Sequence, residues 1–258
     1  MVLTCDIGNS RIKAGIFTDK NLTEVFVCNS VQEIIEKISL YHIREVAISS
    51  VVPANSQELQ NSLYNLDISP FIISKNSEFN LSIDYKSPDT LGMDRLCSAE
   101  GAYFLNKQKR TLRQNHLIIT IDFGTASTIN VVTYPGVFSG GMITPGIDLM
   151  FRSLSNDTAQ LPLVYENEYK DLIGKSTREC IASGVMNSAA GFLQWSLRRI
   201  QEEFEPEKTY IYVTGGNYER IKPFMGFTHN YKEALVLYGI KAIYDKNREA
   251  EKTPTPLS

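Results

Sequence analysis

Two short turns of matching composition, one near the start of the chain and one near its middle, constrain the fold more than any other feature. The first reads Asp-Ile-Gly-Asn at 6–9 and follows an apolar run at 1–5. The second reads Asp-Phe-Gly-Thr at 122–125 and follows an apolar run at 116–121. Another apolar run comes after each turn, so both units are predicted to be two strands joined by a tight bend. A unit repeated in this way indicates a duplicated domain.

The chemistry of the first turn suits a phosphate group. Gly8 lets backbone N–H groups approach an anionic oxygen closely. Asn9 and Ser10 add hydrogen-bond donors and Lys13 adds a positive charge. Asp6 offers a carboxylate to a metal ion or to its bound waters. Hairpin turns that bind nothing have a similar composition, but the second copy favours phosphate binding at both turns.

The composition argues against several classes of partner. The 258 residues are 43% hydrophobic, which is enough for two lobes with cores of ordinary size. Lys and Arg number 26 against 29 Asp and Glu, and the basic cluster at 107–113 lies where a helix is expected to end. We therefore expect no nucleic-acid partner. No apolar run approaches the roughly 20 residues of a membrane span, so we expect no membrane partner either.

The cysteines predict a reducing compartment. The four of them, at positions 5, 28, 97 and 180, are scattered without a C-x-x-C pair, and the first residues read as a strand rather than as a signal sequence. We therefore expect reduced thiols in a cytoplasmic protein.

Apolar periodicity predicts an alternation of strands and helices along the rest of the chain. Strands are expected at 12–17, 22–28, 46–52, 71–74, 129–132, 137–143 and 210–214. Helices are expected at 30–40, 56–66, 178–204 and 232–244, from 147 onward, and from 92–95 to about 109. We place one lobe at 1–113, a second at 114–247 and a disordered tail at 248–258, whose residues are charged and include prolines.

A third motif, Gly-Met-Asp-Arg at 92–95, opens one of the predicted helices. The N–H groups and the positive dipole end of a helix start attract anions, so Asp94 and Arg95 lie where a charged substrate could bind. On this motif alone, a residue that only stabilises the helix start is the favoured interpretation of Asp94.

Six segments together carry a resemblance to a known family. They are D-x-G-N-S-x-x-K at 6–13, G-x-D-R at 92–95, D-x-G-T-A at 122–126, G-G-x-I-x-P-G at 140–146, T-A-x-L-P at 158–162, and G-x-S-T with a following S-G at 174–184. In this order they resemble the actin, sugar kinase and Hsp70 ATPase superfamily and, within it, type III pantothenate kinase. The resemblance implies an α/β fold of two duplicated ribonuclease H-like lobes, with mixed sheets flanked by helices.

The resemblance also implies an activity and a site. The activity is ATP-dependent phosphorylation of pantothenate to 4′-phosphopantothenate, the first step of coenzyme A biosynthesis. The residues implied for ATP binding are Asp6, Ile7, Gly8, Asn9, Ser10, Arg11, Ile12, Lys13 and Thr125. Those implied for pantothenate binding are Tyr85, Gly92, Met93, Asp94, Arg95 and Thr177, with Asp94 also the catalytic base. Asp122 is implied to coordinate a monovalent cation, potassium or ammonium, while Mg²⁺ arrives with ATP, and a homodimer is implied to form the site at its interface.

Several alternatives stay open at this point. The sequence alone does not separate the roles of Asp6 and Asp122, since both could order the waters of Mg²⁺. A Ser or Thr before the helix at 178–204 could be only a cap. Glu100 replaces the small apolar residue that the family more often has, and we expect it to face solvent or the dimer surface. A kinase of the same superfamily acting on another small alcohol, or a non-catalytic regulator that keeps the nucleotide fold, would share most of these motifs.

Overall fold

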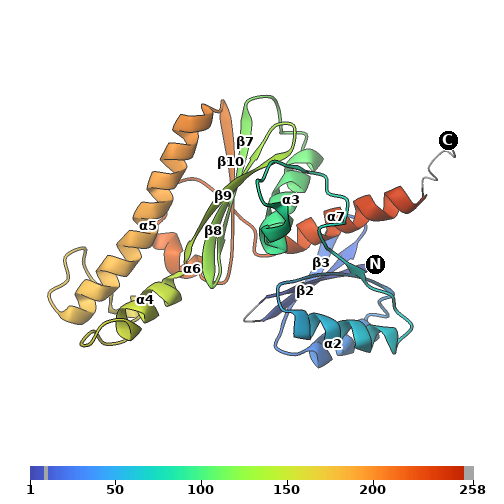
Figure 1. Ribbon diagram of the computed structural model, residues 1–258, viewed down its shortest axis with the longest axis horizontal. Helices are drawn as coiled ribbons and strands as arrows, with labels where there is room; N and C mark the ends of the chain where they lie inside the picture. The colour runs from blue at the N-terminus through green and yellow to red at the C-terminus, as the bar shows by residue number, and fades with distance from the viewer. Residues whose placement is uncertain (9–10, 253–258) are drawn as a thin grey trace. The chain divides into compact units, whose positions relative to one another are not determined.

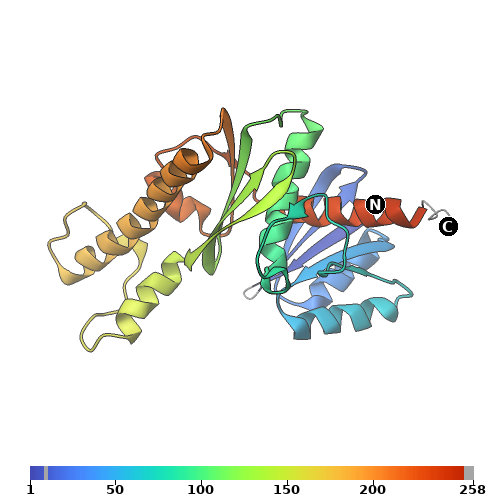
Figure 2. The same ribbon diagram turned by 45° about the horizontal axis from the view of Figure 1, so that its top comes forward.

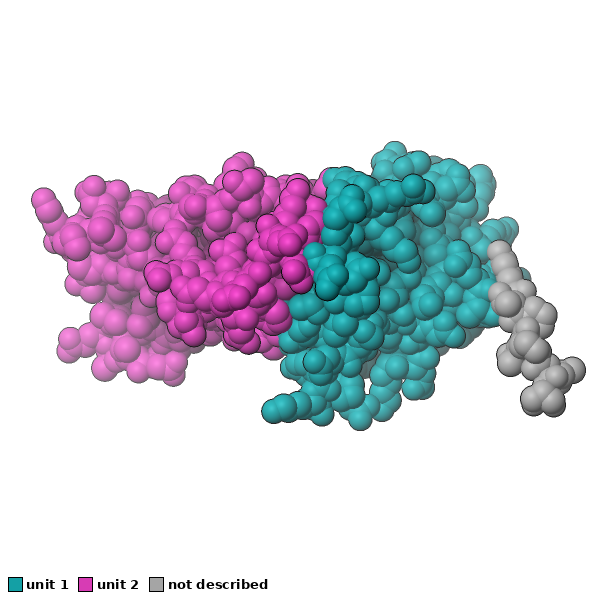
Figure 3. All heavy atoms as spheres, turned by 90° about the horizontal axis from the view of Figure 1, so that it is seen from above, with its two compact units in different colours: residues 1–114, 130–140, 234–258 teal, residues 115–129, 141–233 magenta. Residues whose placement is uncertain are grey.

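The computed structural model describes residues 1–8 and 11–252, apart from the side chain of the last of these. The chain divides into two compact units, coloured separately in Figure 3. Unit 1 contains residues 1–114, 130–140 and the segment from 234 onward, and unit 2 contains residues 115–129 and 141–233. This division follows the packing of segments, whereas the lobes at 1–113 and 114–247 remain a prediction.

Unit 1 is built on a five-stranded sheet with the strand order β3-β2-β1-β4-β5. The strands are β1 Val2–Ile7, β2 Ile12–Thr18, β3 Asn21–Cys28, β4 Glu45–Ser50 and β5 Phe71–Ile72. β1 pairs antiparallel with β2 and parallel with β4, so the sheet is mixed. Both faces of β1 are buried, because Leu3, Cys5 and Ile7 join one hydrophobic core and Val2 joins another.

Helices cover both faces of this sheet. They are α1 Val31–Leu40, α2 Pro53–Tyr64, α3 Met93–Gln108 and α7 Leu235–Lys252, and the turn η1 Pro88–Thr90 precedes α3. Ser30 caps α1, since its hydroxyl accepts a hydrogen bond from the Glu33 N–H. The core shared with α1 and α2 holds Val31 and Leu59, and the core on the other face holds Leu237 of α7.

α3 and α7 cross in close contact, and Figures 1 and 2 both show them side by side. The crossing is possible because each helix has a glycine at the contact. A Cβ at Gly101 would overlap the backbone of Leu235 and Gly239, and a Cβ at Gly239 would overlap the backbone carbonyl of Cys97. The two helix backbones therefore touch directly, and α7 fixes the position of α3.

The second sheet has six strands in the order β11-β10-β7-β8-β9-β6. Its strands are β6 Ser82–Ile83, β7 His116–Phe123, β8 Ala126–Thr133, β9 Val137–Pro145, β10 Lys208–Thr214 and β11 Asn230–Tyr231. In chain order, β7 to β11 repeat the arrangement of β1 to β5, with the first strand of each set lying parallel to its fourth. The predicted duplication is therefore confirmed by topology.

The remaining helices of unit 2 include two that the sequence predicts, from residue 147 onward and at 178–204, and a short one that it does not. They are α4 Ile147–Asn156, α5 Thr177–Phe204 and α6 Tyr218–Ile221, together with the 3₁₀ turns η2 Glu166–Glu168 and η3 Lys222–Phe224. Within the part of the chain that the structure describes, no helix combines the length and the apolar character needed to cross a bilayer.

Two expectations from the sequence are corrected. Helix α7 continues to Lys252, five residues into the expected tail, and Arg248 there pairs with Glu251 one turn later. Glu100 does not face solvent or a dimer surface. Its exposed fraction is 0%, and its carboxylate accepts hydrogen bonds from the Leu81 N–H and the Asn80 amide. These donors compensate for burying an acid on α3.

Candidate functional site

The first Asp-x-Gly turn joins β1 to β2. Asp6 lies in β1 rather than at the bend, where it stands opposite Lys13 of β2 and beside Ser49 of β4. The turn closes where the Gly8 N–H donates to the Arg11 carbonyl at 3.2 Å. Asn9 and Ser10 lie outside the described residues.

Two of the residues implied for ATP binding have buried side chains. Ile7 is 0% exposed and Ile12 is 2% exposed, and both belong to the hydrophobic core of unit 1. Contact between either residue and a nucleotide is therefore restricted to the backbone. Arg11, in contrast, is exposed.

The start of α3 carries the candidate base. Gly92 is the N-cap, Met93 is the first helical residue and Asp94 is in the first turn. A Cβ at Gly92 would lie 2.5 Å from Oδ1 of Asp94, so the glycine leaves room for the carboxylate to fold back over the helix start. The positive end of the helix dipole lies beside this carboxylate.

Asp94 and Asp6 both lie in the neighbourhood of Cys97 within unit 1. Cys97, one turn after Asp94, donates from its thiol to the Ser49 hydroxyl at 3.8 Å, and Ser49 is the strand neighbour of Asp6. Burial raises the pKa of the Cys97 thiol well above its usual value, the Ser49 hydrogen bond lowers it, and the negative charges of Asp6, Glu100 and Asp94 raise it further. Both candidate carboxylates therefore lie near the same buried thiol.

The structure also brings Arg95 and Tyr85 together. Arg95 is 6% exposed, and its Nε donates to Oδ1 of Asn130 at 2.7 Å, while Nη1 lies 3.5 Å from the Tyr85 hydroxyl. Its guanidinium lies 5.9 Å from the centre of the Tyr85 ring and 5.8 Å from that of Phe138. These contacts hold a buried cation, and they use two of its five N–H donors.

The second Asp-x-Gly turn joins β7 to β8, and two other segments of unit 2 hold it. Asp122 is the last residue of β7 that pairs with β10, and it lies opposite Thr214. Gly215, at φ +104°, packs so tightly on Asp122 and Phe123 that a Cβ would overlap their atoms. On the other side, the Gly146 N–H at the start of α4 donates to the Thr125 carbonyl at 3.0 Å.

Thr177 is the first residue of α5 and is exposed. The capping role belongs to its neighbour Ser176, whose hydroxyl accepts from the Glu179 N–H at 3.3 Å. The Thr177 side chain is therefore not required for the cap and is available to a ligand.

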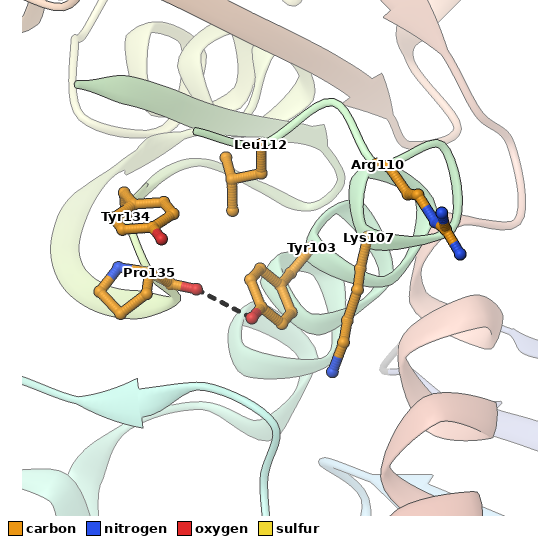
Figure 4. A pocket seen from close by; sticks show the side chains of 6 residues that line it. All are labelled: Tyr103, Lys107, Arg110, Leu112, Tyr134 and Pro135. Atoms are coloured by element: carbon orange, nitrogen blue, oxygen red, sulfur yellow. Dashed lines mark hydrogen bonds between the residues drawn. The ribbon is translucent and has the colours of Figure 1, made fainter. Parts of the chain in front are cut away.

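A pocket of about 300 Å³ lies in another part of unit 1, at the C-terminal end of α3 (Figure 4). Its lining residues are Tyr103, Lys107, Arg110, Leu112, Tyr134 and Pro135. The rise of about 1.5 Å per helical residue separates Lys107 from Asp94 by about 20 Å along the helix. Lys107 and Arg110 complement the negative end of the helix dipole there, as the sequence predicts for the basic cluster.

Two polar residues that matter for these sites were missed in the sequence. Asn130, which is fully buried and holds Arg95, is a polar residue between Ile129 and Val131 in the apolar part of its strand. That interruption is the signal that could have revealed it, because a buried amide requires a partner. Arg220, which bonds to Asn217 beside the second turn, follows no recognisable pattern in the sequence.

Comparisons with known proteins agree with the fold and with the motifs. A family model described as type III pantothenate kinase matches residues 2–199. A type III pantothenate kinase from Legionella pneumophila (strain Corby) is 31% identical over 256 residues, which cover 93% of this chain and 97% of the relative. One from Geotalea daltonii is 28% identical over 265 residues, which cover 97% of this chain and 100% of the relative.

Solved structures match the whole chain at low identity. Component A of (R)-2-hydroxyglutaryl-CoA dehydratase from Acidaminococcus fermentans has a TM-score of 0.54 and 12% identity, over 98% of this chain and 99% of its own. The ethanolamine utilization protein EutJ from Carboxydothermus hydrogenoformans has a TM-score of 0.50 and 12% identity, over 94% of this chain and 89% of its own. These two likenesses concern the fold, which is that of the actin and sugar kinase superfamily. The family model and the sequence relatives, which span nearly the full length, show that the chain belongs to the type III pantothenate kinase family.

Proposed function

We propose that Asp94 is the general base with which this chain performs its family's reaction. That reaction is ATP-dependent phosphorylation of pantothenate in coenzyme A biosynthesis. In the proposed step, Asp94 accepts the proton of the pantothenate hydroxyl as the oxygen bonds to the γ-phosphorus. The bond from that phosphorus to the β–γ bridging oxygen breaks, and ADP leaves with the electron pair. The observation that carries this proposal is the position of Asp94 at the start of α3, where Asp94 and Asp6 both lie near Cys97 of unit 1.

The ATP phosphates are proposed to bind at the two Asp-x-Gly turns. The first turn would contribute residues 6–13, with Lys13 as the cation and Gly8 providing access to backbone N–H groups. Thr125 would contribute from the second turn, where it is exposed. Mg²⁺ accompanies ATP in kinases and neutralises the charge of its phosphates.

Pantothenate is proposed to bind through its carboxylate at Arg95. A guanidinium binds a carboxylate through two parallel hydrogen bonds, and Arg95 keeps N–H donors available for this purpose. Tyr85 would share this end of the substrate because its hydroxyl lies beside Arg95. Gly92, Met93 and Thr177 complete the set that the family resemblance implies.

A monovalent cation, potassium or ammonium, is proposed to bind at Asp122. The donors there suit such an ion, since they are the Asp122 carboxylate and the backbone carbonyls of a tight turn. The described residues contain no group of three or more acidic, His or Cys side chains that could hold a metal ion. A weakly held monovalent ion fits one carboxylate better than a resident divalent ion would.

The chain is also proposed to act in the cytoplasm as a homodimer, with unit 2 contributing to the interface. Unit 2 exposes large apolar side chains on α5 and on the loop before it, among them Trp195 at 60% and Ile173 at 75%. Covering such side chains is a usual reason for association. Thr177, which lies between them in the sequence, would then contact the substrate near that interface. Sedimentation of the active enzyme as a monomer would contradict this part of the proposal.

The substitution Asp94→Asn tests the base. It preserves the shape of the side chain but removes the proton acceptor, so we expect kcat to fall by about two to four orders of magnitude with ATP binding unchanged. Asp89→Asn is a matched control, because Asp89 lies just before α3, is exposed and pairs only with Lys75 among the contacts that the structure gives it. Near-normal turnover of Asp94→Asn would refute the assignment. Turnover of a sugar or another alcohol in preference to pantothenate would refute the substrate.

A further inference from the structure

Arg220 of α6 bonds to three side chains of unit 2, two of which belong to segments that contact the second Asp-x-Gly turn. Its Nε and Nη2 each lie 2.5 Å from an oxygen of Glu166 in η2. Its Nη1 donates to Oδ2 of Asp148 in the first turn of α4 at 3.1 Å, and its Nη2 lies 2.9 Å from Oδ1 of Asp148. Nη1 also donates to Oδ1 of Asn217 at 2.8 Å. A planar guanidinium with all these partners has little freedom to move.

Asn217 connects Arg220 to the turn through hydrogen bonds. Its backbone N–H donates to the Phe123 carbonyl at 3.0 Å, and its Nδ2 donates to the Gly124 carbonyl at 3.3 Å. Because Arg220 is a donor only, the oxygen of the Asn217 amide must face Arg220 and the nitrogen must face Gly124. Arg220 therefore fixes which end of the amide meets the turn.

Asp148 connects Arg220 to α4, whose start contacts the other side of the turn. It lies two residues after Gly146, whose N–H donates to the Thr125 carbonyl. A Cβ at Gly146 would overlap the carbonyl oxygens of Gly124 and Thr125, so α4 begins in direct contact with the turn. The Gly124 carbonyl is thus held by the Asn217 amide, and the Thr125 carbonyl is held by the Gly146 N–H. Arg220 bonds to Asn217 and to Asp148 of α4, so it is connected to both segments that carry these donors.

Charge adds a second effect. The side-chain hydrogen bond from Arg220 is the main reason that the pKa of Glu166 lies below its usual value, although partial burial opposes it. Without Arg220, Glu166 and Asp148 would place two uncompensated negative charges near a turn that is proposed to meet phosphates. Such charges repel an anionic ligand.

We infer that Arg220 is a positioning residue for nucleotide binding, acting through Asn217 and Asp148 on the backbone of the turn at 122–125. This inference rests on the proposed binding of ATP phosphates at that turn. Arg220 itself is not expected to touch the nucleotide. Its loss should therefore change the apparent affinity for ATP and leave that for pantothenate nearly unchanged.

The test compares Arg220→Ala, Arg220→Lys and Asn217→Asp with the wild type in steady-state kinetics. We expect Arg220→Ala to raise KM for ATP by about tenfold or more, with KM for pantothenate within about twofold, because a displaced turn weakens the contacts that it makes. Arg220→Lys keeps the charge but loses the paired hydrogen bonds and should be intermediate. Asn217→Asp keeps an acceptor for Arg220 but cannot donate to the Gly124 carbonyl, so it should also raise KM for ATP.

Controls separate this inference from the proposed function. Arg248→Ala removes an arginine whose ion pairs with Glu251 and Glu45 are at the surface, and it should leave both KM values unchanged. Calorimetric titration with a non-hydrolysable ATP analogue measures nucleotide binding even if a variant turns over slowly. If the wild type phosphorylates pantothenate but Arg220→Ala and Asn217→Asp bind the analogue as tightly as it does, the inference is wrong. If the wild type binds no ATP, the proposed function itself fails.

Discussion

The contact between α3 and α7 leads to a prediction about both stability and turnover. In Gly239→Ala, the new methyl group would overlap the backbone carbonyl of Cys97, which cannot rotate away as a side chain could. Overpacking of this kind costs about 1–3 kcal/mol, and a contact between two backbones belongs at the upper end of that range. Alanine recovers about 1 kcal/mol as the better helix former, so we expect a net loss of about 2 kcal/mol in the free energy of unfolding.

Thermal unfolding and steady-state kinetics measure the two consequences. A loss of about 2 kcal/mol corresponds to a fall in Tm of about 4–8 °C for a chain of this size. Cys97 lies one turn from Asp94, so a displacement of α3 should also reduce kcat, by as much as about a hundredfold if Asp94 moves by 1 Å. Gly191→Ala is the matched control, because a Cβ there meets nothing within 4 Å and should raise the stability by about 0.5–1 kcal/mol. If Gly239→Ala proved as stable as Gly191→Ala, the reasoning from direct backbone contact would be refuted.

Three further predictions concern buried charges and the cation. Burial is the main reason that the pKa of Glu100 lies above its ordinary value of 4.5, so the native state retains a proton that the unfolded state releases. The free energy of unfolding of the wild type, relative to that of Glu100→Gln, should therefore fall as the pH rises from 4.5 through that raised pKa. If urea unfolding gave the same difference between the two proteins at every pH, this prediction would be contradicted. Asp245→Ala should cost about 3 kcal/mol in urea unfolding, because it leaves the buried Lys241 ammonium without the carboxylate that now lies 2.6 Å away, whereas Glu251→Ala at the surface should cost less than about 1 kcal/mol. Replacing potassium with sodium should depress turnover in a coupled ADP-release assay, and equal rates in the two salts would remove Asp122 from its proposed role.

Much of the fold could be predicted from local pattern. The strands around each Asp-x-Gly turn are buried on at least one face, so they are rich in apolar residues, and the helices have clear periodicity. The duplication was also visible, because the same residue types recur with the same flanking strands. The family followed from six motifs, and the comparisons confirm it.

The contacts that hold the candidate site could not be predicted in the same way. Glu100 looked like a surface residue, since an acid is rarely fully buried, and only the fold brings the Leu81 N–H to it. The pairing of Gly101 with α7 joins residues more than a hundred positions apart and leaves no local signal. The residues that flank Arg220 in the sequence have the composition of an ordinary surface segment, so nothing there indicates its contacts. The roles of the individual site residues toward ATP and pantothenate remain predictions.

The burial of three of the four cysteines leaves one thiol accessible for selective labelling. Cys5, Cys28 and Cys97 are buried and have raised pKa values, whereas Cys180 is exposed in the first turn of α5, three residues after Thr177. Because alkylating reagents attack an accessible thiolate, a fluorophore or spin label should attach at Cys180 in the folded wild-type chain without any engineered cysteine. Such a probe would report directly on whether pantothenate, ATP or a second subunit changes the surroundings of Thr177.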